Sequence, residues 1–301
     1  MSISSCSPPH QPAARSKLDD QAYELMRNRR FTDAIDVLTD AIKQNPNDIA
    51  AYSERALAYS FLGKYDKQLE DLSKAIELDS SEPSRYKERA NAYLWTRDYV
   101  KAYADVDKAI QLNASYAPAY ALKSNIDNYT QKYDDAIKDA SKAIELEPQS
   151  ADAYENRAEA HLALHQLSQA ITDAQAALRA NPQSAEAFTT LGTSEIEMGQ
   201  TKDGVMDCAR ALAIRPDYGR AYQARALAFL QIGLDREAVG ECTRAIQAGV
   251  QEADVYAHRA LAHIHLKQYK QAVPDCQAAL KLDPKNELAK KCLALAKSKQ
   301  P

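Results

Sequence analysis

The chain has 301 residues, of which 45% are hydrophobic and 27% are charged, and its 38 Lys and Arg against 42 Asp and Glu give a net charge of −4. These proportions are ordinary for a soluble protein, and the net negative charge argues against general electrostatic binding of nucleic acid, which requires a basic stripe. No stretch approaches the roughly 18 apolar residues that a membrane-spanning helix needs. We therefore expect no nucleic acid as a partner and no membrane span.

The first 14 residues, MSISSCSPPHQPAA, contain no apolar run and no basic cluster. They do not form a secretory signal as written, and their composition predicts a flexible N-terminal arm over residues 1–14. With five cysteines and no export signal, the reducing cytoplasm is the expected location.

From Arg15 onward the sequence aligns with itself in eight consecutive blocks of 34 residues, without insertion or deletion. The blocks begin at residues 15, 49, 83, 117, 151, 185, 219 and 253. Position 27 is Ala in all eight, from Ala41 to Ala279, and positions 8 and 20 are mostly small. Position 4 is large in every block: Leu18, Tyr52, Tyr86, Tyr120, Tyr154, Phe188, Tyr222 and Tyr256. Large and small residues at fixed offsets predict two short helices per block, packed on each other and on the next pair.

This pattern resembles the tetratricopeptide repeat, which has a large residue at 4, small residues at 8, 20 and 27, and often Pro at 32. Pro stands at position 32 in five blocks: Pro46, Pro148, Pro182, Pro216 and Pro284. The resemblance covers residues 15–286 and implies an all-α, right-handed α-solenoid. We assign residues 15–284 to eight repeats and residues 285–301, which are amphipathic and Lys-rich, to a helix that caps the last apolar face.

Two blocks depart from the pattern. The fourth contains Ser124 and Asp127, and the sixth contains Glu195, Thr201 and Gly204. We expect looser packing or a bend at both places.

A second ladder of residues runs through the repeats. Position 7 is Arg in five blocks, and position 23 is Asp or Glu in seven, whereas the first block has Gln21 and Val37 instead. Helices that turn near position 15 bring positions 7 and 23 level, so a guanidinium can meet a carboxylate there. We interpret these residues as structural pairs, with an acidic ligand for the arginines as the alternative.

Neither a metal site nor a catalytic site is predicted. Cys208, Cys242 and Cys276 share position 24 of successive blocks, and helices 8–10 Å apart keep them too distant for one zinc ion or for a disulfide. His161 and His165 are four residues apart but have no evident third ligand. Because no phosphate loop, nucleophile elbow or carboxylate pair appears either, we expect no cofactor, no metal and no enzyme activity.

The resemblance implies that positions 2, 6, 9 and 13 of each block line a concave groove for a peptide or a partner helix. The aromatic residues among them either line this groove or pack against the following turn. The asparagines offer donors and acceptors for a peptide backbone. The candidate site residues are Asp20, Glu54, Glu88, Phe61, Trp95, Tyr129, Asn91, Asn125, Asn156 and Glu159.

The motif YxxRAxAY, present as YSERALAY and YKERANAY, resembles repeats of co-chaperones that bind Hsp70 and Hsp90. The Lys, Asn and Arg set of their carboxylate clamp is absent from any three successive blocks, so we reject that role. We predict a non-catalytic adaptor that binds a protein or peptide of basic, or mixed basic and apolar, character. The alternatives are a self-associating scaffold and a co-chaperone-like or regulatory module acting on a separate catalytic chain. The oligomeric state stays open, with a monomer slightly favoured.

Overall fold

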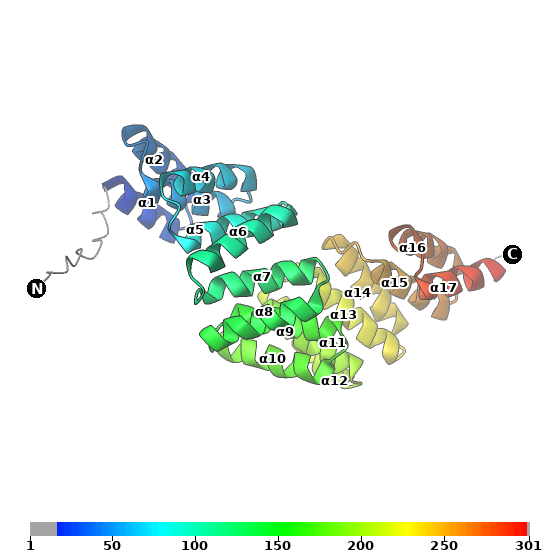
Figure 1. Cartoon of the computed structure of the whole chain (residues 1–301). Coiled ribbons are helices and arrows are strands. Elements are labelled where there is room, and N and C mark those ends of the chain that lie inside the picture. The colour runs from blue at the N-terminus through cyan, green and yellow to red at the C-terminus, as the bar shows by residue number, and fades with distance from the viewer. Residues whose placement is uncertain (1–16, 300–301) are drawn as a thin grey trace, which may run out of the picture. The chain divides into compact units, whose positions relative to one another are not determined.

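The computed structural model describes residues 17–299, and this part of the chain contains helices and no strand (Figure 1). The predicted arm over residues 1–14 lies outside the described residues. The fold class is therefore the all-α solenoid of helical hairpins that the sequence predicts. No helix in residues 17–299 is both long and apolar enough to cross a membrane.

The described residues divide into two compact units, one that ends at Leu122 and one that begins at Lys123. The first unit contains α1 (Lys17–Arg27), α2 (Phe31–Gln44), α3 (Ile49–Phe61), α4 (Tyr65–Leu78), α5 (Pro83–Trp95), α6 (Tyr99–Leu112) and the start of α7 (Ala117–Tyr129). The second contains the rest of α7, then α8 (Tyr133–Leu146), α9 (Ala151–Ala163), α10 (Leu167–Ala180), α11 (Ala185–Glu197), α12 (Thr201–Ile214), α13 (Gly219–Gln231), α14 (Asp235–Gln247), α15 (Ala253–His265), α16 (Tyr269–Leu282) and α17 (Glu287–Ser298). The division follows Leu122, inside the block that carries the atypical Ser124 and Asp127.

The helices follow the 34-residue period of the sequence. From α3 onward, each odd-numbered helix up to α15 begins at a predicted block start: 49, 83, 117, 151, 185, 219 and 253. The last helix, α17, occupies the segment predicted as a cap and packs on α16 through Cys276 and Cys292. The number of complete repeats stays a prediction.

Each block turns from its first to its second helix through one residue in the left-handed backbone region. That residue is at position 15 in every block: Arg29, Gly63, Arg97, Gln131, His165, Gly199, Gly233 and Lys267. Glycine adopts this conformation without a steric penalty, and other residues do so at some cost. Backbone hydrogen bonds close the turn in the five blocks that lack the glycine, as where the Arg97 N–H donates to the carbonyl of Leu94 at 3.0 Å and the Asp98 N–H to that of Tyr93 at 2.9 Å.

Small residues form the core between the helices. Ala56, Ala75, Ala90 and Ala102 are all within 1% of complete burial, so the helix backbones approach closely. Cys208, Cys242 and Cys276 are also fully buried, and each packs in a different apolar cluster. Burial raises the pKa of the Cys208 and Cys242 thiols to about 12. These cysteines are core residues, as the sequence predicts.

The expectation of loose packing in the sixth block is wrong. Gly192 of α11 and Gly204 of α12 face each other so closely that a Cβ added at Gly192 would lie 2.6 Å from the Gly204 carbonyl oxygen and 2.7 Å from Sγ of Cys208. Two glycines at small-residue positions let these helices approach more closely than two alanines would allow. The departure from the repeat pattern thus produces a tighter contact.

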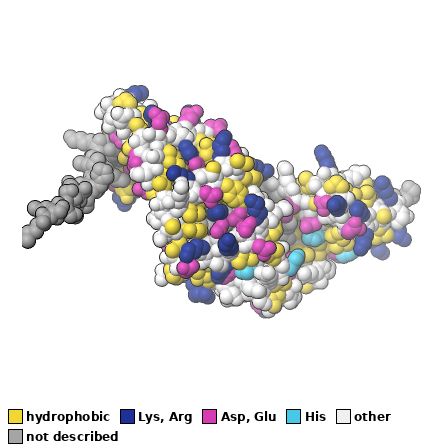
Figure 2. Space-filling model, in the orientation of Figure 1, with side chains coloured by type: hydrophobic (Ala, Val, Ile, Leu, Met, Phe, Trp, Pro, Cys, Tyr) yellow, Lys and Arg dark blue, Asp and Glu magenta, His cyan; other side chains and the backbone are white. Residues whose placement is uncertain are grey.

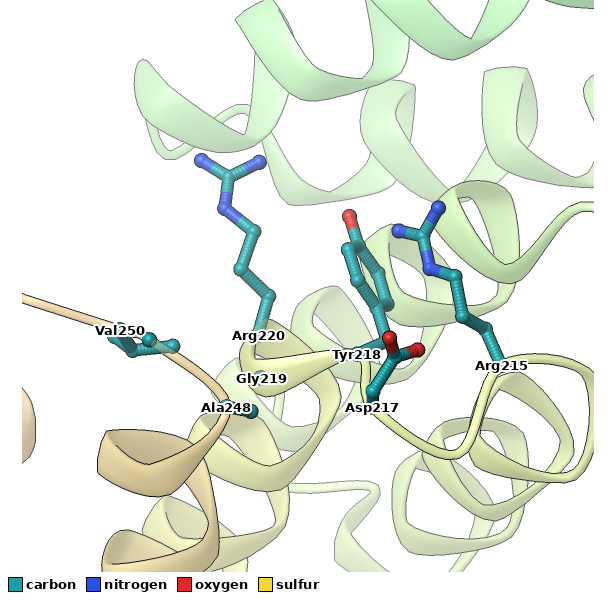
Figure 3. A pocket seen from close by; sticks show the side chains of 8 residues that line it. Arg215, Asp217, Tyr218, Gly219, Arg220, Ala248 and Val250 are labelled. Atoms are coloured by element: carbon teal, nitrogen blue, oxygen red, sulfur yellow. The ribbon is translucent and has the colours of Figure 1, made fainter. Parts of the chain in front are cut away.

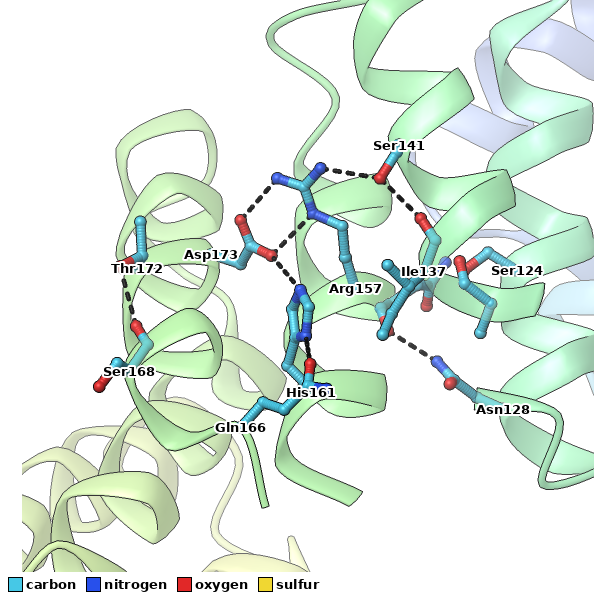
Figure 4. A network of polar contacts seen from close by, with 12 residues as sticks. Ser124, Asn128, Ile137, Ser141, Arg157, His161, Gln166, Ser168, Thr172 and Asp173 are labelled. Atoms are coloured by element: carbon cyan, nitrogen blue, oxygen red, sulfur yellow. Dashed lines mark hydrogen bonds and ion pairs between the residues drawn. The ribbon is translucent and has the colours of Figure 1, made fainter. Parts of the chain in front are cut away.

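The arginine ladder pairs as predicted and has a third member. Arg157 binds Asp173 through Nε and Nη2, both at 2.8 Å, while its Nη1 donates to Oγ of Ser141 in the preceding block at 3.0 Å (Figure 4). The same three-residue arrangement recurs in three other places: Arg55 with Asp71 and Thr39, Arg89 with Asp105 and Ser73, and Arg259 with Asp275 and Thr243. We call each such trio a rung. A rung joins one block to the block before it.

Candidate partner-binding groove

A groove with a volume of about 410 Å³ lies within the second unit, lined by side chains of α7, α8, α9, α11, α13 and α15. It runs along the first helices of successive blocks, where the resemblance places the concave face. Its lining includes residues at positions 2, 6, 9 and 13 of the block: Arg220, Asp254, Thr190, Ala224, His258, Glu159, Thr193, Leu227, Ala163 and Glu197. The lining therefore mixes carboxylates, hydroxyls and apolar side chains.

The charges of the groove are arranged in pairs that leave an acidic excess. Glu159 accepts from Nη1 of Arg220 at 2.6 Å, whereas Glu197 faces Nδ1 of His165 at 3.2 Å and Asp254 accepts from the amide of Asn286 at 2.8 Å. Figure 2 shows acidic and basic side chains intermingled over one face of the molecule. Against this mixed background, three carboxylates and one guanidinium give the groove a negative balance.

Burial shifts the pKa of two titratable groups on helices that line the groove, Glu155 of α9 and His258 of α15. Burial raises the pKa of Glu155 to about 7, opposed by a hydrogen bond with Ser184 and assisted by the neighbouring carboxylates of Asp152 and Glu186. Burial also lowers the pKa of His258, whose Nδ1 is buried without a hydrogen-bond partner. Burial thus favours the neutral form of both side chains.

A second hollow, of about 400 Å³, lies where the segment before α13 meets the segment between α14 and α15. Figure 3 shows Arg215, Tyr218 and Arg220 extending in the same direction from this edge. The Arg215 guanidinium stacks 3.7 Å from the centre of the Tyr218 ring and pairs with Glu186 at 2.7 Å. Since Arg220 is paired with Glu159, the two guanidinium groups here already have acidic partners. Tyr218 and Arg220 line both hollows.

Four of the predicted polar site residues lie in the first unit. Asp20 is exposed, Glu54 and Asn91 are half-buried, and Glu88 pairs with Nζ of Lys87 at 3.0 Å. Their role in binding stays a prediction.

Two of the three predicted aromatic residues at position 13, Phe61 and Trp95, are partly exposed and stack on another ring. Phe61 is 60% exposed and stacks on Phe31 with ring centres 4.6 Å apart. Trp95 is 56% exposed and stacks on Tyr65, with ring centres 6.1 Å apart and planes 6° from parallel. Packing against a neighbouring ring therefore does not prevent Phe61 or Trp95 from lining a groove, because each ring has one packed face and one exposed face.

The partners of these rings, Phe31 and Tyr65, were not among the residues predicted from the sequence. Phe31 and Tyr65 stand at position 17 of the block before, and the same two positions meet elsewhere through polar side chains. Oγ1 of Thr201 donates to Gln231 at 3.3 Å, and Nδ1 of His265 lies 2.7 Å from Asp235. The sequence does indicate this contact, because positions 17 and 13 change together: both are aromatic in early blocks and both are polar in late ones.

The remaining predicted site residues belong to the second unit. Tyr129 is exposed and Asn125 is half-buried. The backbone carbonyl of Asn156 accepts from Nδ2 of Asn128 at 2.8 Å. Among the ten predicted residues, Glu159 lines the groove described above.

Known proteins with similar sequences share short segments with this chain. It is 35% identical over 60 residues to Hsp70-Hsp90 organizing protein 1 of Glycine max, which is 20% of this chain and 10% of that protein. It is 40% identical over 57 residues to Tetratricopeptide repeat protein 36 of Caenorhabditis briggsae, covering 19% of this chain and 32% of that protein. The chain thus matches a minor part of each relative's length.

Solved structures share the fold over a much longer span. The APC/C hetero-tetramer Cut9-Hcn1 superposes with a TM-score of 0.76 at 16% identity, covering 93% of this chain and 55% of that one. A tetratricopeptide repeat protein from Parabacteroides merdae gives a TM-score of 0.61 at 15% identity, covering 83% of this chain and 98% of that one. At these identities the likeness establishes the fold.

The helical hairpins, their period and the groove along their first helices define a repeat protein of the interaction-module class. One model of the tetratricopeptide repeat matches residues 20–83 and 129–187, and a second model of this family matches residues 253–286. The chain belongs to the tetratricopeptide repeat family.

Proposed function

We propose that this protein is a non-catalytic adaptor whose second unit binds a basic, or mixed basic and apolar, segment of another protein. The observation that carries this proposal is the groove, which presents Glu159, Glu197 and Asp254 against the single guanidinium of Arg220. A cationic segment would therefore be attracted to it, and its association would be faster at low salt.

Apolar side chains of the same groove support the mixed character of the partner. Leu162 and Leu227 lie beside Ala163 and Ala224, where small side chains leave room for a ligand. Apolar surface contributes affinity in proportion to the area removed from water, about 25 cal/mol per Å². The carboxylates would then orient the segment and the leucines would hold it.

The proposal is tested by calorimetric titration of the full chain with blocked peptides that alternate Lys and Leu or Glu and Leu. The Lys peptide is expected to bind at low ionic strength and to lose affinity as salt shortens the screening length below about 8 Å. Glu197→Gln and Asp254→Asn should each weaken binding, because each removes one charge from the groove.

A matched control is Glu145→Gln, which removes an exposed carboxylate of α8 that pairs with Lys142 outside the groove. It should leave the affinity unchanged. Equal binding of the Lys and Glu peptides, or equal loss in the control, would contradict an acidic groove. Sedimentation over a range of protein concentrations, in the same buffer, would show a concentration-dependent mass if the chain were instead a self-associating scaffold.

A further inference from the structure

Two buried thiols meet where the capping helix α17 packs on α16. Cys276 of α16 is fully buried and Cys292 of α17 is 3% exposed, and both are free cysteines of one apolar cluster. The Cys276 thiol donates a hydrogen bond to the sulfur of Cys292. Sulfurs that share a hydrogen bond are in contact, and a disulfide holds them about 2 Å apart. A short inward shift therefore brings them to bonding distance.

The repeat restricts this pairing to one place among the described residues. Cys276 stands at position 24 of the eighth block, and Cys292 stands at position 6 when the 34-residue period is continued past that block. Cys208, at position 24 of the sixth block, shares its cluster with Ala224, at position 6 of the seventh. The cluster around Cys242 contains no second cysteine. Of the three buried cysteines at position 24, Cys276 thus has another thiol beside it.

The two thiols differ in acidity, and this difference indicates which one reacts first. The hydrogen bond that Cys276 donates, together with burial, raises the pKa of its thiol, whereas accepting that bond lowers the pKa of the Cys292 thiol against the effect of burial. The thiolate is the nucleophile in disulfide exchange. Cys292 is therefore the thiol that attacks an oxidant, and Cys276 is the thiol that completes the bond.

Local opening of α17 gives an oxidant access to Cys292. Within residues 17–299, α17 packs on α15 and α16 and on no later helix. Each element of a repeat array contacts its neighbours, so a helix with neighbours on one side opens at a lower free-energy cost than an inner helix. In its closed position α17 covers apolar side chains that include Ile264 and Ala272. Opening exposes these side chains together with the two thiols.

We propose that Cys276 and Cys292 form a reversible disulfide when a low-molecular-weight disulfide is the oxidant, and that this bond locks α17 onto α16. The Cys292 thiolate attacks one sulfur of the oxidant, such as glutathione disulfide, whose S–S bond breaks and releases one thiolate. The Cys276 thiolate then attacks the Cys292 sulfur of the mixed disulfide and releases the second. The protein loses two electrons, its two thiol protons go to the two released thiolates, and the oxidant is reduced to two thiols. This inference is independent of the groove, whose lining includes no residue of α17.

The test exposes the full chain to increasing ratios of glutathione disulfide to glutathione, in a Cys6→Ser background because Cys6 lies outside the described residues. Free thiols are then alkylated with N-ethylmaleimide in denaturant, counted by intact mass and located by peptide mapping. We expect alkylation of Cys208 and Cys242 together with a cross-linked Cys276–Cys292 peptide, and full alkylation after treatment with dithiothreitol. Alkylation of every thiol at the most oxidising ratio, a glutathione adduct as the end product, or a different pairing would overturn the proposal.

Two alanine variants provide the controls. Cys292→Ala removes one sulfur and introduces the residue that the seventh block has at this position, Ala224, so it should fold and form no intramolecular disulfide. Cys242→Ala removes the cysteine at position 24 of the block before Cys276 and should leave the disulfide unchanged. Helical circular dichroism and the midpoint of thermal unfolding establish that both variants are folded. Loss of the disulfide in Cys242→Ala would contradict the assigned pair.

The lock is measured by hydrogen exchange of the α17 backbone amides in the oxidised and the reduced protein. Exchange in α17 should be at least roughly tenfold slower in the oxidised protein, because the bond restrains the open state. Amides of α9, far along the chain, should exchange at the same rate in both forms. In Cys292→Ala the oxidant should not change exchange in α17. A Cys276–Cys292 disulfide that leaves α17 exchange as it is in the reduced protein would overturn the lock.

Discussion

Arg157 and Asp173 are joined by two parallel hydrogen bonds of 2.8 Å each, and the carboxylate is almost fully buried while the guanidinium is one-fifth exposed. The planar fork of the arginine matches the two carboxylate oxygens, and its remaining amino group reaches Ser141 on the neighbouring block. The residue that looked like a possible ligand-binding cation is thus committed to holding two repeats together.

Arg157→Ala is expected to lower the free energy of unfolding by about 1–3 kcal/mol, because the buried carboxylate loses its two guanidinium donors and keeps only Nε2 of His161, at 3.6 Å. Lys142→Ala is the control, since it breaks a more exposed pair with Glu145 in the same unit and should cost about 0.5 kcal/mol or less. Urea denaturation monitored by circular dichroism measures both. Peptide affinity should not change in either variant, and a loss of binding at normal stability would return the arginines to the binding site.

Gly192→Ala is expected to destabilise the protein by about 1–3 kcal/mol, because the new methyl group would overlap the Gly204 carbonyl and the Cys208 sulfur. Gly240→Ala is the opposite case. A Cβ at Gly240, within α14, would meet nothing within 4 Å, and alanine is favoured over glycine in a helix by about 1 kcal/mol. The two substitutions are chemically identical, so opposite signs in thermal unfolding would isolate the close approach of α11 and α12.

Stability should fall as pH rises toward neutrality, in part because of Glu195. Burial and the neighbouring carboxylate of Asp207 raise the pKa of Glu195 to about 7, compared with about 4.3 in an unfolded chain. Between these values the folded protein holds a proton that the unfolded chain has released, so the free energy of unfolding decreases with rising pH. Glu195→Gln keeps the neutral form permanently and should flatten this part of the profile.

Urea denaturation at about pH 5 and about pH 8 measures the effect. Glu155 and Asp139, whose pKa values burial raises to about 7 and about 6, contribute in the same direction, so the Gln variant should reduce the slope without abolishing it. The exposed Glu145→Gln should leave the slope as it is in the parent protein. A parent profile that rises over this range would contradict the assignment.

The fluorescence of Trp95 is expected to be that of a surface indole with one packed face. Its indole is 56% exposed and stacks on Tyr65, so its fluorescence should be only partly blue-shifted in the free protein. Trp95→Ala should cost about 1 kcal/mol, the usual size of an aromatic pair, and well below the 3–5 kcal/mol typical of a fully buried ring. Trp95→Phe should recover most of that loss, and a loss of buried-core size would show that the indole is packed on both faces.

Much of the fold could be predicted from spacing, because the helix starts, the buried alanines and cysteines and the Arg–Asp pairs depend on residues at fixed offsets. The location of the groove could not. A groove forms where side chains are small, and in the second unit Ala163 and Ala224 occupy positions that carry Phe61 and Glu54 in the first. The predicted site included the bulky aromatics Phe61 and Trp95 of the first unit, whereas space for a ligand is found where the side chains are small.

The rungs make the order of the blocks matter. The hydroxyl that completes each rung belongs to the block before it. At Arg225 the corresponding residue of the block before is Ala209, which has no hydroxyl. Arg225 makes one hydrogen bond to Glu241, at 3.1 Å, and its Nε has no partner. A block cut out and moved would carry its arginine and its acid but leave its third member behind. The four blocks that carry a rung are therefore not interchangeable modules. Each depends on a hydroxyl of the block before it, so an array that places such a block after one without that hydroxyl would lose the hydrogen bond, although every individual repeat still matched the family pattern.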